Sequence, residues 1–114
     1  MPEITIYHNP RCATSRKALA LLRERGIEPH VVEYLKSPPD RATLKRLLNM
    51  LGLSPRALLR KKEAKEAGLD HPSLSDDQII AGMEKHPIAI ERPIVVNGDR
   101  AVLARPPEAA LKVL

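Results

Sequence analysis

Aromatic residues are nearly absent from this 114-residue chain, which has no Trp, no Phe and only two tyrosines, Tyr7 and Tyr34. Proteins that hold single-stranded nucleic acid stack its bases on aromatic side chains, so this scarcity argues against a nucleic-acid partner. The core must be built from aliphatic side chains instead. With 43% hydrophobic and 29% charged residues, the composition is that of a globular protein and not of a disordered one.

Cysteine is equally scarce, because Cys12 is the only one in the chain. A single thiol can form neither a disulfide within the chain nor a thiolate metal cluster, which excludes a disulfide scaffold and a cysteine-based metal centre. The histidines His30, His71 and His86 lack the spacing of metal ligands, and we expect no metal site.

Long apolar runs are missing too. The first residues, MPEITIYHNP, lack the basic segment and apolar stretch of a secretory signal, so we expect no membrane association. A cytoplasmic location follows as an expectation, since a free thiol persists there. The formal net charge of +5 fits either a solvated basic surface or an anionic substrate or partner. Only the position of particular arginines distinguishes these two alternatives.

Hydrophobic periodicity predicts a chain that mixes strands and helices. Residues 3–7 and 31–34 favour strands, and the segment from Ser15 to Gly26 between them favours a helix. Such a βαβ unit predicts two parallel strands. Further helices are expected from Ser37 to Gly52, over residues 56–62 with a solvated end in residues 61–68, and after a capping signal at Ser75.

The period changes after residue 87. Residues 93–96 and 101–104 predict two strands, with Asn97-Gly98 as the hairpin turn, and residues 108–114 predict a short terminal helix. The order βαβ, helices, ββ hairpin and helix is that of an α/β, thioredoxin-like mixed sheet. A helical insertion then separates the βαβ and ββα halves. We expect a single domain over residues 1–114.

The loop from His8 to Ser15 is the expected place of the chemistry. Cys12 stands between a strand and a helix, where backbone N–H groups and basic neighbours such as Arg11 and Arg16 favour a thiolate. Ser15 follows three residues later, so its hydroxyl can reach the sulfur. The alternative is a small buried apolar cysteine, and the position beside Arg11 at a helix start favours the reactive interpretation over it.

The segment HNPRCATSRKAL (8–19) resembles the active-site segment of the glutaredoxin-coupled arsenate reductases, in which a C-x-x-S motif replaces the C-x-x-C of dithiol glutaredoxins. RALLRKKE (56–63), ERPIVV (91–96) and ARPPE (104–108) match the same family in order and spacing. Together these segments resemble the family over nearly the whole chain.

The resemblance implies a role for each matching residue. Cys12 is the nucleophile that attacks arsenate and forms a covalent thiol–arsenate adduct. Three arginines surround the oxyanion, namely Arg60, Arg92 and Arg105. His8 matches a loop histidine near the sulfur, either tuning the thiol or ordering the loop, and Pro93 matches a cis-proline opposite the loop. Asn9 and Ser15 complete the supporting residues.

One sulfur cannot supply the two electrons that reduce As(V) to As(III) and also complete a disulfide within the chain. The second thiol must come from outside, and the resemblance implies glutathione as co-substrate and glutaredoxin as the protein that resolves the mixed disulfide. No bound cofactor is expected.

Two alternatives stay open. The first is a regulator of the related Spx type that binds RNA polymerase, although Ser15 rules out the C-x-x-C sensor of some of those proteins. The second is a glutathione-dependent thiol-transferase or oxyanion-binding protein with another substrate. The chain stops soon after ARPPE, whereas longer arsenate reductases continue, and this leaves the physiological substrate open.

Overall fold

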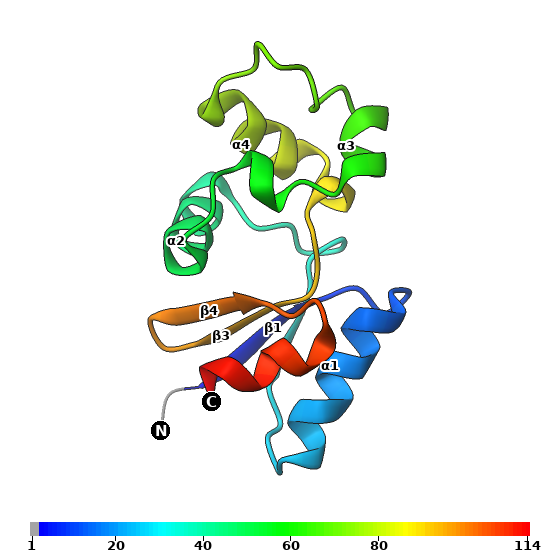
Figure 1. Cartoon of the computed structure of the whole chain (residues 1–114), viewed down its shortest axis with the longest axis vertical. Helices are drawn as coiled ribbons and strands as arrows, with labels where there is room; N and C mark the ends of the chain where they lie inside the picture. Colours follow the sequence, from blue (N-terminus) through cyan, green and yellow to red (C-terminus); the bar gives the residue numbers. More distant parts are fainter. Residues whose placement is uncertain (1–2) are drawn as a thin grey trace. The chain divides into compact units, whose positions relative to one another are not determined.

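The computed structural model describes residues 3–114, which form two compact units (Figure 1). The first unit contains residues 3–37 and Arg92–Leu114. The second unit, Pro38–Glu91, is the helical insertion expected between the two halves of the fold. That the chain behaves as a single domain stays a prediction. Within residues 3–114, no helix is long and apolar enough to cross a lipid bilayer.

A four-stranded mixed sheet forms the centre of the first unit, with the strand order β2-β1-β3-β4. The strands are β1 (Ile4–His8), β2 (His30–Glu33), β3 (Ile94–Asn97) and β4 (Arg100–Leu103). β1 pairs in parallel with β2 and antiparallel with β3, and β3 pairs antiparallel with β4. The predicted βαβ unit and antiparallel hairpin are therefore confirmed, and the fold is thioredoxin-like.

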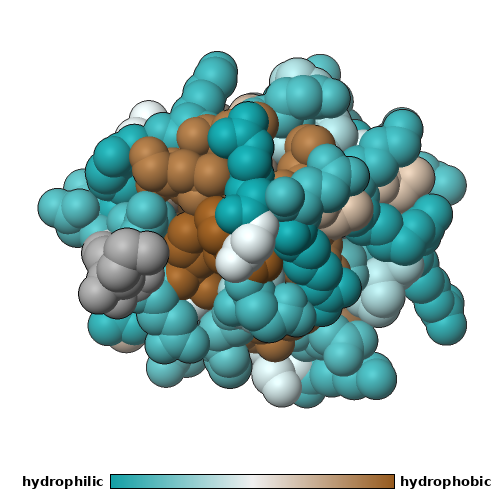
Figure 2. All heavy atoms as spheres, turned by 90° about the horizontal axis from the view of Figure 1, so that it is seen from below, coloured by the Kyte–Doolittle hydropathy of each residue, from teal (hydrophilic) through white to brown (hydrophobic). Residues whose placement is uncertain are grey.

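One face of this sheet is covered by two helices that contact each other, α1 (Ala13–Glu24) and the 3-10 helix η3 (Pro107–Val113), drawn in red in Figure 1. Their buried core is aliphatic, as the scarcity of aromatic residues requires. It consists of Ile6, Ala18, Leu19, Leu22, Val95, Ala104, Ala110 and Val113. Burying one such Leu or Ile contributes about 1.5–3 kcal/mol. Hydrophilic side chains surround the apolar area visible on the face in Figure 2.

The hairpin turn lies one residue later than the sequence predicted. Asn97 is the last paired residue of β3, opposite Arg100, so the central turn residues are Gly98 and Asp99. Gly98 has φ +64°, a value that glycine adopts without steric cost at this position of a tight turn. The Asn97 side chain instead donates a hydrogen bond from Nδ2 to the Val113 carbonyl oxygen at 2.6 Å, which joins the hairpin to η3.

The second unit consists of short helices. They are α2 (Arg41–Leu51), η1 (Arg56–Leu58), α3 (Lys61–Glu66), α4 (Asp76–Lys85) and η2 (Pro87–Ala89). Ser75 caps α4 in a full capping box with Gln78, as predicted. The prediction that α2 begins at Ser37 is wrong. Asp40 caps it instead, because its carboxylate accepts the Thr43 N–H at 2.8 Å.

The single helix predicted over residues 56–62 is also wrong, because Leu59 and Arg60 are extended and separate η1 from α3. Leu59 forms an antiparallel bridge with Ile90, and the Arg60 N–H donates to the Ala89 carbonyl oxygen at 2.8 Å. This pairing between distant segments competes with helical hydrogen bonds. α3 is consequently a separate helix with a buried side, where Ala64 is only 1% exposed, and not a solvated helix end.

Candidate active site

Cys12 is the N-cap residue of α1, directly after the loop that leaves β1. Its N–H donates to the Asn9 carbonyl oxygen at 3.0 Å, and its own carbonyl oxygen accepts the Arg16 N–H at 3.0 Å. The loop thus closes in a turn that leads straight into the helix. The sulfur lies beside the N–H groups of the first helical turn, where negative charge is stabilised.

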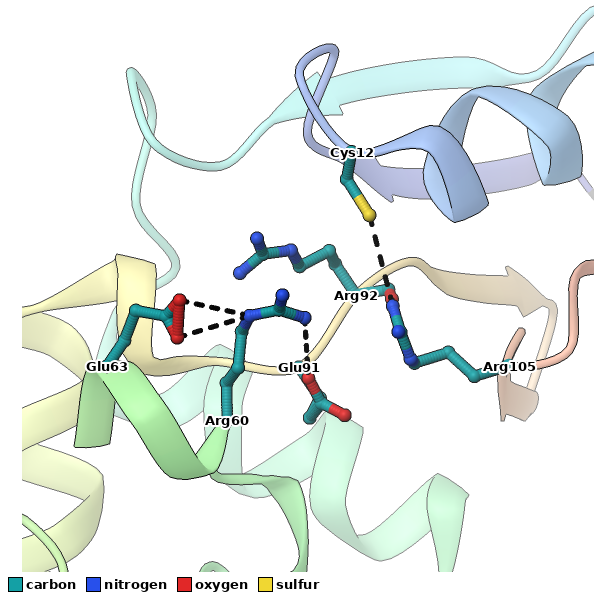
Figure 3. A network of polar contacts seen from close by, with 6 residues as sticks. All are labelled: Cys12, Arg60, Glu63, Glu91, Arg92 and Arg105. Atoms are coloured by element: carbon teal, nitrogen blue, oxygen red, sulfur yellow. Dashed lines mark hydrogen bonds and ion pairs between the residues drawn. The ribbon is translucent and has the colours of Figure 1, made fainter. Parts of the chain in front are cut away.

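The thiol of Cys12 has a lowered pKa, in the direction that the sequence predicted. Burial raises the pKa, but the Ser15 N–H, hydrogen bonds from Arg92 and Arg105, and the charge of Arg92 together lower it by more. Arg105 Nη1 lies 3.9 Å from Cys12 Sγ (Figure 3). A lower pKa increases the fraction of thiolate at neutral pH, and the thiolate is the nucleophilic form.

Arg92 and Arg105 come from opposite ends of the hairpin region but meet at Cys12. Arg105 Nη1 donates to the Arg92 carbonyl oxygen at 3.0 Å, and the Ala104 N–H donates to the Pro93 carbonyl oxygen at 2.9 Å. The Arg92–Pro93 peptide bond is cis, as predicted, and the Arg105–Pro106 bond is cis as well, which the sequence did not predict. Both guanidinium groups contact the Cys12 sulfur.

The Ser15 hydroxyl bonds within the loop and not with the Cys12 sulfur, which corrects the expectation from spacing. Ser15 Oγ accepts the Asn9 N–H at 3.1 Å and lies 2.6 Å from His8 Nδ1. The reason is that Ser15 is fully buried and points back to the end of β1, where two polar groups need partners. It is the backbone N–H of Ser15 that lowers the pKa of Cys12.

His8 contacts the loop through this serine, and its role in ordering the loop or tuning the thiol stays a prediction. Burial lowers the pKa of His8. The charge of Glu33 opposes this effect, whereas the charges of Arg23 and Arg16 add to it, so the neutral imidazole is favoured. Because Ser15 Oγ already accepts the Asn9 N–H, its single proton can be donated to His8 Nδ1. In that tautomer the ring proton of His8 is on Nε2, whereas a proton on Nδ1 would be donated to Ser15 Oγ instead.

Tyr34 is a candidate that the sequence analysis missed. Its side chain is 2% exposed, directly after β2. Burial raises the pKa of its hydroxyl, while hydrogen bonds with Arg92 and Asn9 oppose that effect and the charge of Cys12 adds to it. The hydroxyl thus connects the cysteine loop with an arginine of the site. The sequence did contain a signal for this residue. Tyr34 follows β2, and because β2 runs parallel to β1, it ends at the same edge of the sheet as the loop after β1.

Arg60 belongs to the second unit, where it stands between η1 and α3. Its Nε lies 3.2 Å from each carboxylate oxygen of Glu63, and its Nη1 lies 3.3 Å from Glu91 Oε1 (Figure 3). Burial lowers the pKa of Arg60, but the two carboxylates outweigh it and raise the pKa, so the charge is permanent. A role of Arg60 in oxyanion binding stays a prediction.

Among the described residues 3–114, no group of three or more His, Cys, Asp or Glu side chains is arranged to hold a metal ion.

Comparison with known proteins extends over both units. The model of the ArsC family matches residues 7–113. An arsenate reductase from Neisseria meningitidis serogroup A is 50% identical over 117 aligned positions, which cover 100% of both chains. An arsenate reductase from Escherichia coli is 49% identical, with 100% of this chain aligned to 82% of the relative. A solved structure of an arsenate reductase from Vibrio cholerae is 48% identical with a TM-score of 0.95, covering 99% of this chain and 98% of that one.

Proposed function

The chain belongs to the ArsC family, and on that premise we propose that it reduces arsenate to arsenite with Cys12 as the nucleophile. The observation that carries the proposal is a thiol with a lowered pKa beside the guanidinium groups of Arg92 and Arg105. Relatives that share about half of their residues over the full length of this chain are named arsenate reductases, which supports arsenate as the substrate.

The charges of the site suit an anionic substrate. A thiolate and an arsenate dianion repel each other, so attack requires compensating positive charge between them. Arginine is permanently charged and offers a planar fork of N–H groups that matches the oxygens of a tetrahedral oxyanion. Arg92 and Arg105 already lie at the sulfur. Arg60 is proposed as the third donor because it matches the family's third arginine.

The proposed reaction balances without a bound cofactor. Cys12 sulfur attacks arsenic, a sulfur–arsenic bond forms, and one arsenate oxygen leaves as water. The thiol of glutathione then attacks Cys12 sulfur, the sulfur–arsenic bond breaks, and its electron pair stays on arsenic, which becomes As(III). In sum, arsenate and two thiols give arsenite, water and a Cys12–glutathione disulfide. A glutaredoxin thiol reduces that disulfide and restores Cys12.

A coupled assay tests this proposal. NADPH oxidation is followed with arsenate, glutathione, glutathione reductase and glutaredoxin present, and we expect turnover that needs every component. Cys12→Ser should abolish it, and phosphate should inhibit without being reduced, because thiols do not reduce phosphorus(V). Arsenate-independent turnover of a glutathione disulfide would support a thiol-transferase instead. A cytoplasmic location, where glutathione keeps Cys12 reduced, is part of the proposal.

A further inference from the structure

The guanidinium of Arg60 is enclosed by two carboxylates that the proposed reaction does not use. The side chains of Arg60, Glu63 and Glu91 are 30%, 15% and 22% exposed, so these ion pairs are largely shielded from water. By comparison, the surface pair of Arg23 and Glu28 has side chains 52% and 71% exposed. Shielded pairs hold a fixed geometry, whereas exposed pairs exchange readily with water.

Both carboxylates are fixed by the backbone around Arg60. Glu63 lies in the first turn of α3, three residues after Arg60, which is itself the N-cap of that helix. Glu91 is held by the antiparallel pairing of Leu59 with Ile90, because its N–H donates to the Leu58 carbonyl oxygen at 2.8 Å beside that bridge. The Arg60 N–H donates in the same pair, to Ala89. The positions of all three charged groups are therefore set by one local structure within the second unit.

The two ion pairs use two of the three guanidinium nitrogens. Nε donates to Glu63, and Nη1 donates one N–H to Glu91. The remaining donors are the two N–H groups of Nη2 and the second N–H of Nη1, and two of these form a parallel fork. Two carboxylates also outnumber the single positive charge. Arg60 must then bind an anion through directed hydrogen bonds more than through net charge.

We propose that Glu63 and Glu91 are positioning residues that orient Arg60 so that its Nη1–Nη2 edge receives the oxyanion. This inference rests on the proposed function, in which Arg60 binds the substrate. The carboxylates act through Arg60 and do not touch the substrate. They convert a long, flexible side chain into a pre-oriented donor, which reduces the ordering required when the anion binds.

The test compares alanine and glutamine at both positions in the coupled arsenate assay. Glu91→Ala and Glu63→Ala should each lower kcat/KM for arsenate about tenfold, the effect of losing one well-placed charged hydrogen bond. Glu91→Gln and Glu63→Gln keep an acceptor oxygen and should retain most activity. The two glutamine variants should also not raise the KM for arsenate, because each removes a negative charge that repels the anion. Glu28→Ala, at the exposed surface pair, is the matched control and should leave turnover unchanged.

A double-mutant cycle shows whether the effect passes through Arg60. Glu91→Ala should cost little further activity in an Arg60→Ala background, since the group it orients is gone. A second readout does not need turnover. Bound inorganic phosphate should protect Cys12 from alkylation by iodoacetamide, and this protection should be weaker in Glu91→Ala but preserved in Glu91→Gln. Full additivity with Arg60→Ala, or equal losses in Ala and Gln variants, would overturn the positioning role.

The outcomes also distinguish a failure of this positioning role from a failure of the proposed arsenate reductase function. If the wild-type protein does not reduce arsenate, or if Arg60→Ala behaves like wild type, the proposed function or the role of Arg60 is at fault. If Arg60→Ala loses activity while Glu63→Ala and Glu91→Ala do not, only the positioning inference fails.

Discussion

Replacing Arg105 with alanine should make Cys12 react more slowly at pH values below the pKa of a free thiol. Arg105 is one of the groups that lower the pKa of Cys12, so its removal moves that pKa upward toward the ordinary value of about 8.5. The thiolate fraction rises with pH in both proteins. The variant should therefore react more slowly at neutral pH, and the two rates should converge at a pH above both pKa values.

The expected size follows from the 3.9 Å between Arg105 Nη1 and Cys12 Sγ. Two unit charges at about this distance interact by about 1 kcal/mol in water and by about 4 kcal/mol at an effective dielectric constant near 20. Arg105 is exposed and Cys12 is partly exposed, so screening favours the lower part of this range. An interaction of about 1–2 kcal/mol corresponds to a factor of about 5–30 in the acid dissociation constant of the thiol. The thiolate fraction changes by up to this factor at pH values below both pKa values.

The assay is the rate of Cys12 alkylation by iodoacetamide as a function of pH. Arg105→Lys keeps the charge and should keep most of the reactivity, although it should restore arsenate turnover only in part because the fork is lost. Arg100→Ala is the matched control. Its side chain is exposed at the hairpin end of β4, where Nη2 donates to the Lys112 carbonyl oxygen. Added salt should reduce the difference between wild type and Arg105→Ala.

The reasoning fails if Arg105→Ala and Arg100→Ala give the same pH profile as wild type. It also fails if Arg105→Lys loses as much reactivity as Arg105→Ala, since charge would then not be the cause. A profile in which the two rates stay apart at high pH would indicate altered access to the sulfur and not an altered pKa.

Three further predictions concern other parts of the chain. Because the pKa of His8 is lowered in the folded protein, the unfolded chain binds the proton first, so stability should fall as pH drops through about 6.5 toward the folded pKa. His8→Gln should flatten this decrease in thermal melts. Tyr34→Phe should lower arsenate kcat/KM about two- to tenfold with little loss of stability, measured in the coupled assay, because Arg92 loses a hydrogen bond. Ser75→Ala should destabilise the protein by about 1 kcal/mol in urea unfolding, whereas Ser37→Ala should have almost no effect because Asp40 caps α2.

The sheet was predictable because its signals are local. Short β-rich segments on both sides of a helical period define a βαβ unit, and a right-handed crossover leaves little choice of topology. The parallel pair of β1 and β2 and the antiparallel pair of β3 and β4 followed from these patterns. The position of Cys12 at the start of α1 followed in the same way.

Two predicted boundaries, the start of α2 and the hairpin turn, were misplaced because neighbouring residues are nearly equally suited to each position. Ser37 and Asp40 are both good N-cap residues, and the sequence contains no measure of which one reaches a free N–H. Asn97-Gly98 is a favoured turn pair, yet Gly98-Asp99 also places glycine at a central position, and the pairing of Asn97 with Arg100 decides between them.

Other features depend on contacts between distant residues. The break between η1 and α3 arises from the pairing of Leu59 with Ile90, which no window around residue 59 contains. Tyr34 enters the site because the sheet order places the end of β2 beside the loop after β1. Glu91 contacts Arg60 because the same pairing of Leu59 with Ile90 brings the two segments together. Sequence patterns predicted the candidate reactive groups, but the residues that contact them emerged only from the tertiary structure.

The near absence of aromatic residues has a practical consequence for spectroscopy. With no Trp in the chain, near-ultraviolet absorbance and intrinsic fluorescence come from Tyr7 and Tyr34 alone. Tyr34 is buried, hydrogen-bonded with Arg92 and within the field of the Cys12 sulfur. Ionisation or covalent modification of the sulfur changes the electrostatic environment of one of only two chromophores. Near-ultraviolet circular dichroism can thus follow the state of Cys12 without any attached label.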